Sequence, residues 1–157
     1  MPVQLPSVSD ADLAKLAFSN LASIVAIDSQ SDESSPSIPS TDGQRILADF
    51  VGDYFATLGA TVERDAFANV IATFEGRGDG IGAPPLALMV HLDTARGTEA
   101  VDDLKVVPAW SGDALSYAEN PALTVSTKTY PAVAPFVGQD VVHGGGRAPF
   151  GLDDKLG

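Results

Sequence analysis

Two polar residues at the end of an apolar run are the first candidates for chemistry. His91 and Asp93 follow Leu86–Val90, which is apolar without interruption. Because successive side chains of a strand alternate between its faces, we expect His91 and Asp93 on one side of a strand and Leu92 on the other. A histidine that binds a metal commonly donates its second ring N–H to a carboxylate. The pair therefore has the residue types of a metal-binding site.

The apolar run itself predicts a strand that is buried on both faces. Uninterrupted apolar residues are typical of a central strand in a parallel or mixed sheet, because an edge strand usually alternates with polar residues. Ligands of open α/β sheets bind at the carboxyl ends of such strands, and His91 follows this one directly. The predicted fold class is therefore α/β.

The composition limits the partners of such a site. The chain contains no cysteine, so a transition metal must be held by His, Asp or Glu side chains. The 21 acidic and 9 basic residues give a formal net charge of −12, which disfavours nucleic acids and anionic membrane surfaces. A metal cation, or a substrate with a free ammonium group, meets less repulsion.

The length of 157 residues suits one domain. The N-terminus lacks a basic region followed by a long apolar core, and no apolar run approaches the ~20 residues of a membrane helix. The prediction is a soluble, cytoplasmic protein that does not contact a membrane.

Two predicted helices precede the candidate site. The pair Ser9 and Asp12 has the spacing of a capping box, and the apolar residues after it predict a helix over residues 10–26. Thr41 and Gln44 have the same spacing before a second helix with one apolar face, which Gly59 terminates. Residues 28–40 contain two prolines and no periodicity, so they predict a solvated connecting loop.

Strand signals lie on both sides of the site. The β-rich runs Ala60–Arg64 and Asn69–Phe74 predict two strands joined by a short turn. Gln139–His143 predicts another strand, followed by the tight turn Gly144–Gly146 and a returning strand over Arg147–Leu152. Prolines interrupt the chain between Thr94 and Gly138, where we expect short strands and turns near the site.

Other titratable residues are weaker candidates. His143 is the only other histidine, and it lies beside a glycine turn without a motif partner, which favours a structural role. Four acidic residues between the motifs could add metal ligands, although solvated surface is their default role: Glu99, Asp102, Asp103 and Asp113.

A second motif changes the interpretation of the first. The chain ends in G-L-D-D-K-L-G at Gly151–Gly157, and this motif together with H-L-D-T at His91–Thr94 resembles the co-catalytic zinc exopeptidases, the family that includes peptidase T, carboxypeptidase G and the aminoacylases. The chain is most similar to the peptidase T branch of tripeptide aminopeptidases, because a long interval separates the two motifs and Trp110–Leu115 resembles an aromatic-x-G-D-x-L stretch of that branch. The resemblance covers most of the chain, from the helix before Ile27 to the end.

The resemblance implies a role for three residues. His91 would ligate one of two zinc ions, Asp93 would orient the imidazole as the candidate catalytic residue, and Asp153 would bridge both ions. A carboxylate can offer one oxygen to each of two cations about 3.5–4 Å apart, and imidazole suits zinc. The implied activity is the hydrolysis of short peptides, such as tripeptides, by metal-activated water.

The resemblance also implies that this chain is incomplete. Family members are expected to supply an adjacent Glu-Glu pair, a later acidic ligand and a distant histidine after the second motif. Residues 1–157 are therefore expected to be the N-terminal portion of one metallopeptidase catalytic domain, an incomplete three-layer α/β/α fold with a mixed, largely parallel sheet. The remainder of that domain and a lid or dimerisation domain would be absent. We expect the fragment alone to be inactive, and the full-length protein could form a homodimer.

Two alternatives stay open. The same fold and metals could serve a carboxypeptidase or an N-acyl amino acid hydrolase, because residues that grip the substrate termini are expected beyond Gly157. A non-catalytic acidic α/β module could instead bind a partner through an unpaired sheet edge. Zinc content distinguishes the second alternative from the enzymes.

Overall fold

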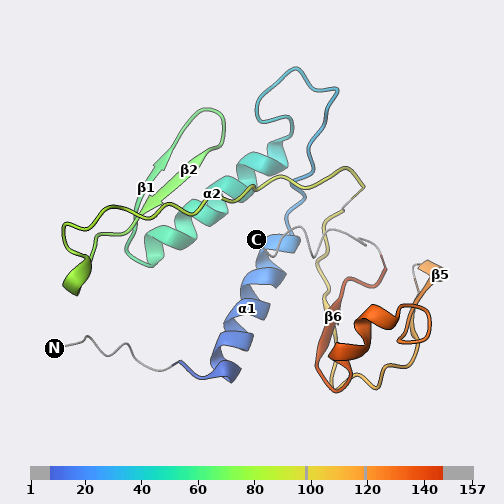
Figure 1. Cartoon of the computed structure of the whole chain (residues 1–157). Coiled ribbons are helices and arrows are strands. Elements are labelled where there is room, and N and C mark those ends of the chain that lie inside the picture. Colours follow the sequence, from blue (N-terminus) through green and yellow to red (C-terminus); the bar gives the residue numbers. More distant parts are fainter. Residues whose placement is uncertain (1–7, 98, 119, 147–157) are drawn as a thin grey trace.

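The computed structural model describes residues 8–97, 99–118 and 120–146. Figure 1 shows α2 and the hairpin β1–β2 as one layered unit, with the later strands at the other end of the molecule. The elements in chain order are α1 (Asp10–Val25), α2 (Asp42–Thr57), β1 (Thr61–Arg64), β2 (Val70–Thr73), the 3₁₀ helix η1 (Gly78–Gly80), β3 (Lys105–Val107), β4 (Leu115–Tyr117), β5 (Asn120–Val125), the 3₁₀ helix η2 (Pro131–Phe136) and β6 (Val141–His143).

Helix α1 begins at its predicted capping box. The Ser9 hydroxyl accepts a hydrogen bond from the Asp12 amide at 3.2 Å, which satisfies one of the amides that lack an intrahelical partner. Only the last turn of the helix is covered, where Val25 packs with Val101 in a small apolar cluster. Leu16, one of the apolar residues farther along the predicted face, remains half exposed. The helix prediction is confirmed, whereas most of its apolar face lacks a cover among the described residues.

Helix α2 and the β1–β2 hairpin form the best-packed unit. Leu47 on α2 is 1% exposed and supplies its core. The strands pair antiparallel with Thr61 opposite Thr73 and Arg64 opposite Val70. Arg64 reaches back to α2 and forms an ion pair with Asp53. This unit confirms the second helix and the two strands predicted after it.

The start of α2 differs from the predicted capping box. Thr41 is the N-cap residue, but its hydroxyl donates to the main-chain oxygen of Gln30 at 2.7 Å instead of capping the helix. The Gln44 side chain accepts from the Ser40 amide at 2.9 Å. The same residue types therefore tie α2 to the loop before it.

The strands of the described residues form three separate two-stranded antiparallel sheets, β1–β2, β3–β6 and β4–β5. The last two confirm the expected short strands between Thr94 and Gly138 and the strand that ends at His143. The returning strand predicted for Arg147–Leu152 lies outside the described residues. The α/β class is confirmed in this coarse form, and among the described residues no helix is long and apolar enough to cross a membrane.

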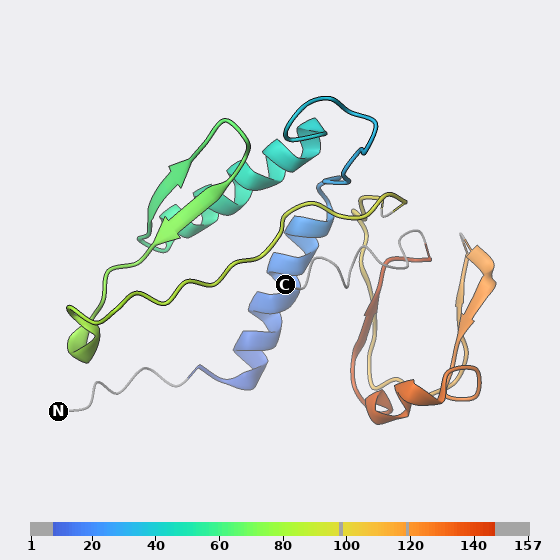
Figure 2. The ribbon, with the colours of Figure 1, turned by 45° about the horizontal axis from the view of Figure 1, so that its top comes forward.

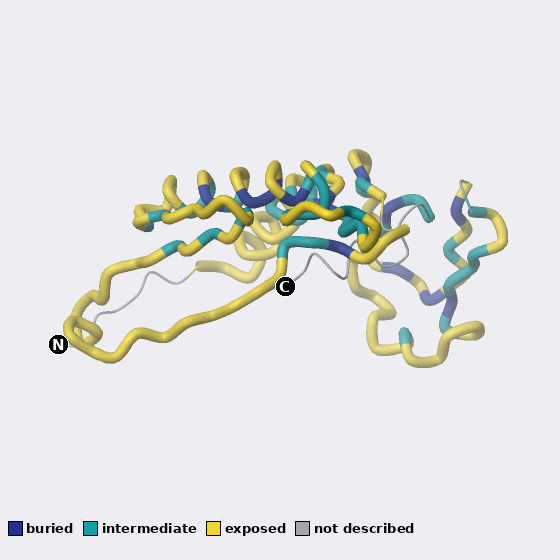
Figure 3. Tube along the Cα trace, turned by 90° about the horizontal axis from the view of Figure 1, so that it is seen from above, coloured by how far each residue is buried: buried dark blue, intermediate teal, exposed yellow. Residues whose placement is uncertain are grey.

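The prediction of a buried central strand at Leu86–Val90 is wrong for the described structure. The segment is not paired with any strand of the described residues, and it runs in one long stretch from η1 back toward the loop between α1 and α2 (Figure 2). Figure 3 shows it as a continuous exposed path. A strand buried on both faces needs neighbours at its edges and layers above and below, and the described elements supply neither.

Candidate metal-binding site

The segment Leu92–Thr94 is held by the loop that follows α1. The Ser29 hydroxyl donates to the Leu92 carbonyl at 2.9 Å, and the Thr94 amide donates to the Ser29 carbonyl at 3.1 Å. Thr94 in turn accepts from the Ser31 amide at 2.9 Å and forms an isolated parallel bridge with Gln30. We call this set of bonds the Ser29–Thr94 clamp. It fixes the chain immediately after His91.

His91 and Asp93 lie together at the start of the clamp. The Nδ1 atom of His91 is 2.7 Å from the main-chain oxygen of Asp93 and 3.4 Å from a carboxylate oxygen of the same residue. Their side chains are 62% and 47% exposed, so the pair is accessible to a ligand. The prediction that both side chains project to one side agrees with this geometry.

The shorter of these two contacts defines which nitrogen of the imidazole carries the proton. A carbonyl oxygen can only accept a hydrogen bond, so Nδ1 of His91 must carry the proton. In a neutral imidazole the other nitrogen, Nε2, then holds the lone pair that a metal requires. The local geometry therefore suits His91 as a metal ligand through Nε2, with Asp93 as the residue that orients the ring.

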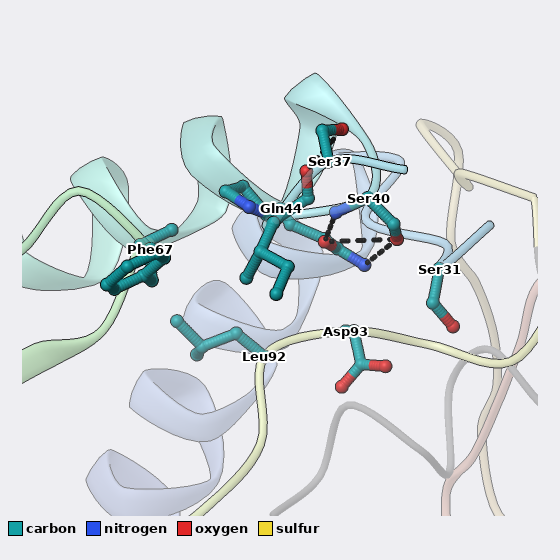
Figure 4. A pocket seen from close by; sticks show the side chains of 10 residues that line it. Ser31, Ser37, Ser40, Gln44, Phe67, Leu92 and Asp93 are labelled. Carbon is teal, nitrogen blue, oxygen red and sulfur yellow. Dashed lines mark hydrogen bonds between the residues drawn. The ribbon is translucent and has the colours of Figure 1, made fainter. Parts of the chain in front are cut away.

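The loop over residues 28–40 is more than a solvated connector. Ser29 is fully buried and Thr94, its clamp partner, is 1% exposed. The same loop lines an open hollow of about 340 Å³ beside the site, and Phe67, Leu92 and Asp93 also line this hollow (Figure 4). No periodic or motif signal in residues 28–40 indicated this role, because the clamp consists of hydrogen bonds between distant segments.

A second hollow of about 330 Å³ is lined by Asp28, Asp32 and Arg96. Arg96 Nη1 is 3.7 Å from a carboxylate oxygen of Asp32. Hydrogen bonds from the Ser34 hydroxyl and amide hold the pKa of Asp32 below its ordinary value, and Arg96 lowers it further. The two carboxylates of this hollow therefore face one guanidinium, and Asp32 already has Arg96 as its cationic partner.

The remaining ligand candidates do not gather around His91 in the described part of the chain. Within residues 8–97, 99–118 and 120–146 there is no group of three or more His, Asp or Glu side chains that could hold a metal ion. Asp153, the predicted bridging ligand, lies outside those residues. The described residues thus contain one ligand candidate with its orienting partner.

His143 has a structural environment. Its ring meets that of Tyr117 edge to face with centroids 5.1 Å apart, and its Nδ1 accepts from the Gly145 amide at 3.1 Å. Burial lowers the pKa of His143, and the nearby Lys105 lowers it further. These contacts agree with the structural role expected from its position beside the glycine turn.

The Trp110–Leu115 stretch also serves a structural purpose. Trp110 is 4% exposed, and its indole N–H donates to the Asp113 carbonyl at 2.9 Å. The Ser111 hydroxyl donates to the Asp113 carboxylate at 2.8 Å. The stretch therefore closes a tight turn around a buried indole, and the Asp113 carboxylate is engaged within that turn.

Comparisons with known proteins relate the chain to peptidases. No family model matches. A peptidase T of Exiguobacterium sibiricum is 32% identical over 139 residues, which cover 87% of this chain and 34% of the relative. A peptidase T of Brevibacillus brevis is 31% identical over 86% of this chain and 33% of its own length. A peptidase T-like protein of Rhizobium meliloti is 31% identical over 83% of this chain and 32% of its own length.

The chain is therefore related to a class of enzymes, the peptidases. The particular relatives are named peptidase T, and the resemblance predicted from the two motifs is confirmed at that level. The chain spans about a third of the length of these relatives.

Proposed function

We propose that this chain is the N-terminal portion of a cytoplasmic dinuclear zinc aminopeptidase that hydrolyses short peptides such as tripeptides. The observation that carries the proposal is the His91–Asp93 pair in a chain related to peptidase T. Nδ1 of His91 is engaged by Asp93 at 2.7 Å, which leaves the ring in the tautomer that zinc ligation through Nε2 requires.

The donor chemistry fits zinc. A histidine that donates through one nitrogen to a protein oxygen is a common zinc ligand, and the orienting contact raises the basicity of the ring. Asp153 would contribute a carboxylate able to span two ions, as the resemblance implies. The described residues contain no complete ligand group, so further ligands would come from outside them.

Each residue has a separate task in the proposed reaction. When bound, the two zinc ions would polarise the scissile carbonyl and lower the pKa of a water molecule. His91 would bind one zinc ion, and Asp93 holds the imidazole in its orientation. The Ser29–Thr94 clamp holds the main chain next to both residues. The net charge of −12 favours a substrate with a free N-terminal ammonium group.

Residues 1–157 alone are not expected to hydrolyse peptides. A dinuclear site needs more ligands than His91 and Asp153, and it needs a general base to accept a proton from the water. The chain matches only about a third of the length of peptidase T relatives, which supports the expectation that these groups lie elsewhere.

The test measures zinc content and the release of N-terminal residues from tripeptides. We would join residues 1–157 to the unmatched part of the Exiguobacterium sibiricum peptidase T and compare this chimaera with the chain alone. The chimaera should bind zinc and turn over tripeptides, whereas the chain alone should be inactive. In the chimaera, His91→Ala and Asp153→Ala should each abolish turnover and lower the zinc content, and His143→Ala serves as the control. Zinc-dependent turnover by residues 1–157 alone would contradict the expected inactivity, and unchanged zinc content in both variants would contradict the proposed ligands.

A further inference from the structure

Ser29 contacts both peptide groups that flank Asp93. Its hydroxyl donates at 2.9 Å to the carbonyl of Leu92, which belongs to the peptide group before Asp93. Its own carbonyl accepts at 3.1 Å from the amide of Thr94, which belongs to the peptide group after Asp93. Ser29 is fully buried, so solvent has no access to its hydroxyl. One buried residue therefore holds the main chain on both sides of Asp93.

The bond from the Thr94 amide decides where the Asp93 carbonyl points. In a planar trans peptide group the C=O and N–H bonds point in opposite directions. The Thr94 N–H points to the Ser29 carbonyl, so the Asp93 C=O of the same peptide group points away from Ser29. Nδ1 of His91 lies 2.7 Å from that Asp93 oxygen. The contact that fixes the proton on Nδ1 thus depends on the bond to Ser29.

The bond from the Ser29 hydroxyl holds the preceding peptide group. Among the described residues, no other donor contacts the Leu92 carbonyl. A rotation of this peptide group would move the Asp93 amide and change the direction in which the Asp93 carboxylate leaves the main chain. Nδ1 of His91 is also 3.4 Å from that carboxylate. The hydroxyl of Ser29 therefore supports the second acceptor of the imidazole.

The Ser29–Thr94 clamp depends on the side chain of Ser29 more than on any other. Thr94 takes part through its main-chain atoms, and its buried hydroxyl has no partner among the described residues. The Ser31 hydroxyl donates to the Thr94 carbonyl at 3.2 Å, but the Ser31 amide donates to the same oxygen at 2.9 Å. The bond of the Ser29 hydroxyl is not duplicated in this way.

We infer that Ser29 is a positioning residue that sets the tautomer and the orientation of the His91 imidazole. It acts through the two peptide groups that flank Asp93. A ring held with its proton on Nδ1 presents Nε2 to a metal in one defined direction. The effect on the ring follows from the metal-free geometry, whereas its consequence for zinc affinity rests on the proposed function.

The test removes the hydroxyl and records the imidazole. Ser29→Ala deletes the bond to the Leu92 carbonyl and keeps the main-chain bond to Thr94. Nitrogen-15 NMR of metal-free residues 1–157 should show the Nδ1–H form of His91 in the unaltered chain and a mixture of both tautomers in Ser29→Ala. Ser29→Cys keeps a side chain of similar size with a weaker donor, and it should also give a mixture. The cysteine variant answers the question if the alanine variant does not fold.

Ser126→Ala is the matched control. Ser126 is also a buried serine, and its hydroxyl accepts from the Thr129 amide at 3.1 Å, but it lies after β5 and outside the clamp. This substitution should leave His91 in the Nδ1–H form. His143 reports folding in the same spectra, because its Nδ1 accepts from the Gly145 amide and its proton must then lie on Nε2.

The chimaera with the unmatched part of the Exiguobacterium sibiricum peptidase T separates the inference from the proposed function. Ser29→Ala should lower its zinc affinity about tenfold, as loss of a contact behind a metal ligand usually does, and Ser126→Ala should not. An unchanged tautomer in folded Ser29→Ala would overturn the inference, and so would an equal mixture in Ser126→Ala. A mixed tautomer in Ser29→Ala together with a chimaera that binds no zinc would uphold the role of Ser29 and contradict only the metal function.

Discussion

Nδ1 of His91 lies closer to the main-chain oxygen of Asp93, at 2.7 Å, than to its carboxylate, at 3.4 Å. The imidazole is thus oriented by the path of the backbone as well as by a side chain. Both acceptors demand a proton on Nδ1, so they favour the same tautomer. Loss of the carboxylate should therefore weaken the orientation of the ring without reversing it.

The first prediction concerns Asp93→Asn in the chimaera. Zinc affinity should fall about tenfold, at the low end of the usual effect of such a change, because the backbone acceptor remains. Nitrogen-15 NMR of His91 in the metal-free protein should still show the Nδ1–H tautomer. Asp79→Asn on η1, which removes an equal charge elsewhere, is the control. A switch to the other tautomer would contradict the role of the main-chain oxygen.

The second prediction concerns the pH response of His143. Burial and Lys105 lower the pKa of His143 in the folded protein, so folding favours the neutral ring. The neutral ring of His143 therefore stabilises the folded protein fully at pH values above the ordinary pKa of about 6.5. This stabilisation is lost as the pH falls through the lowered pKa of the folded protein. Proton NMR should place the midpoint of the His143 titration below 6.5.

Lys105→Gln separates the two causes of that shift. Lys105 is opposite His143 in the β3–β6 register, so removing its charge should raise the titration midpoint toward the ordinary value without reaching it. Lys15→Gln on α1 should leave the midpoint unchanged. An unaltered midpoint in Lys105→Gln would mean that burial alone sets the pKa.

The third prediction uses adjacent residues on α2. Leu47 is 1% exposed and Ile46 is 58% exposed. Leu47→Ala should lower the free energy of unfolding by about 2–5 kcal/mol, because it leaves a cavity between the helix and its neighbours. Ile46→Ala should cost about 0.5 kcal/mol or less. Urea unfolding followed by circular dichroism measures both, and equal losses would show that the packing of this face is wrongly assigned.

The fourth prediction concerns the approach of α2 to the loop after α1. A Cβ atom on Gly43 would collide with the main-chain oxygen of Asp28. Gly43→Ala must therefore separate the helix from the loop, and it should cost about 2 kcal/mol or more. Gly80→Ala, whose Cβ meets no atom within 4 Å, should change stability by about 0.5 kcal/mol or less. Thermal unfolding of the two variants checks the difference.

Local signals predicted the local structure. The capping residues before α1 and the apolar spacing of α2 act within a few residues, and both helices begin and end within about two residues of the expected positions. The turn between β1 and β2 has a similarly local cause. The Asp65 carboxylate accepts from the amides of Phe67 at 2.8 Å and Asn69 at 2.9 Å, which closes the turn.

Distant contacts could not be predicted in the same way. The apolar composition of Leu86–Val90 indicates that its side chains favour burial, but it does not specify which element covers them. Ser29 and Leu92 are 63 residues apart, so their hydrogen bond leaves no trace in local spacing. The His91–Asp93 pair could be predicted because the two residues are close in sequence. The assignment of Asp153 as a bridging ligand stays a prediction.

The Ser29–Thr94 clamp also has a consequence for the order of folding. It joins segments 63 residues apart, and all of α2 and the β1–β2 hairpin lies between them. Closing so long a loop lowers the conformational entropy of the chain. The hydrogen bonds of the clamp offset this loss only after the intervening chain is compact. We therefore expect the helix and hairpin to form early and the clamp to form late. His91 would reach its final setting in one of the last steps of folding.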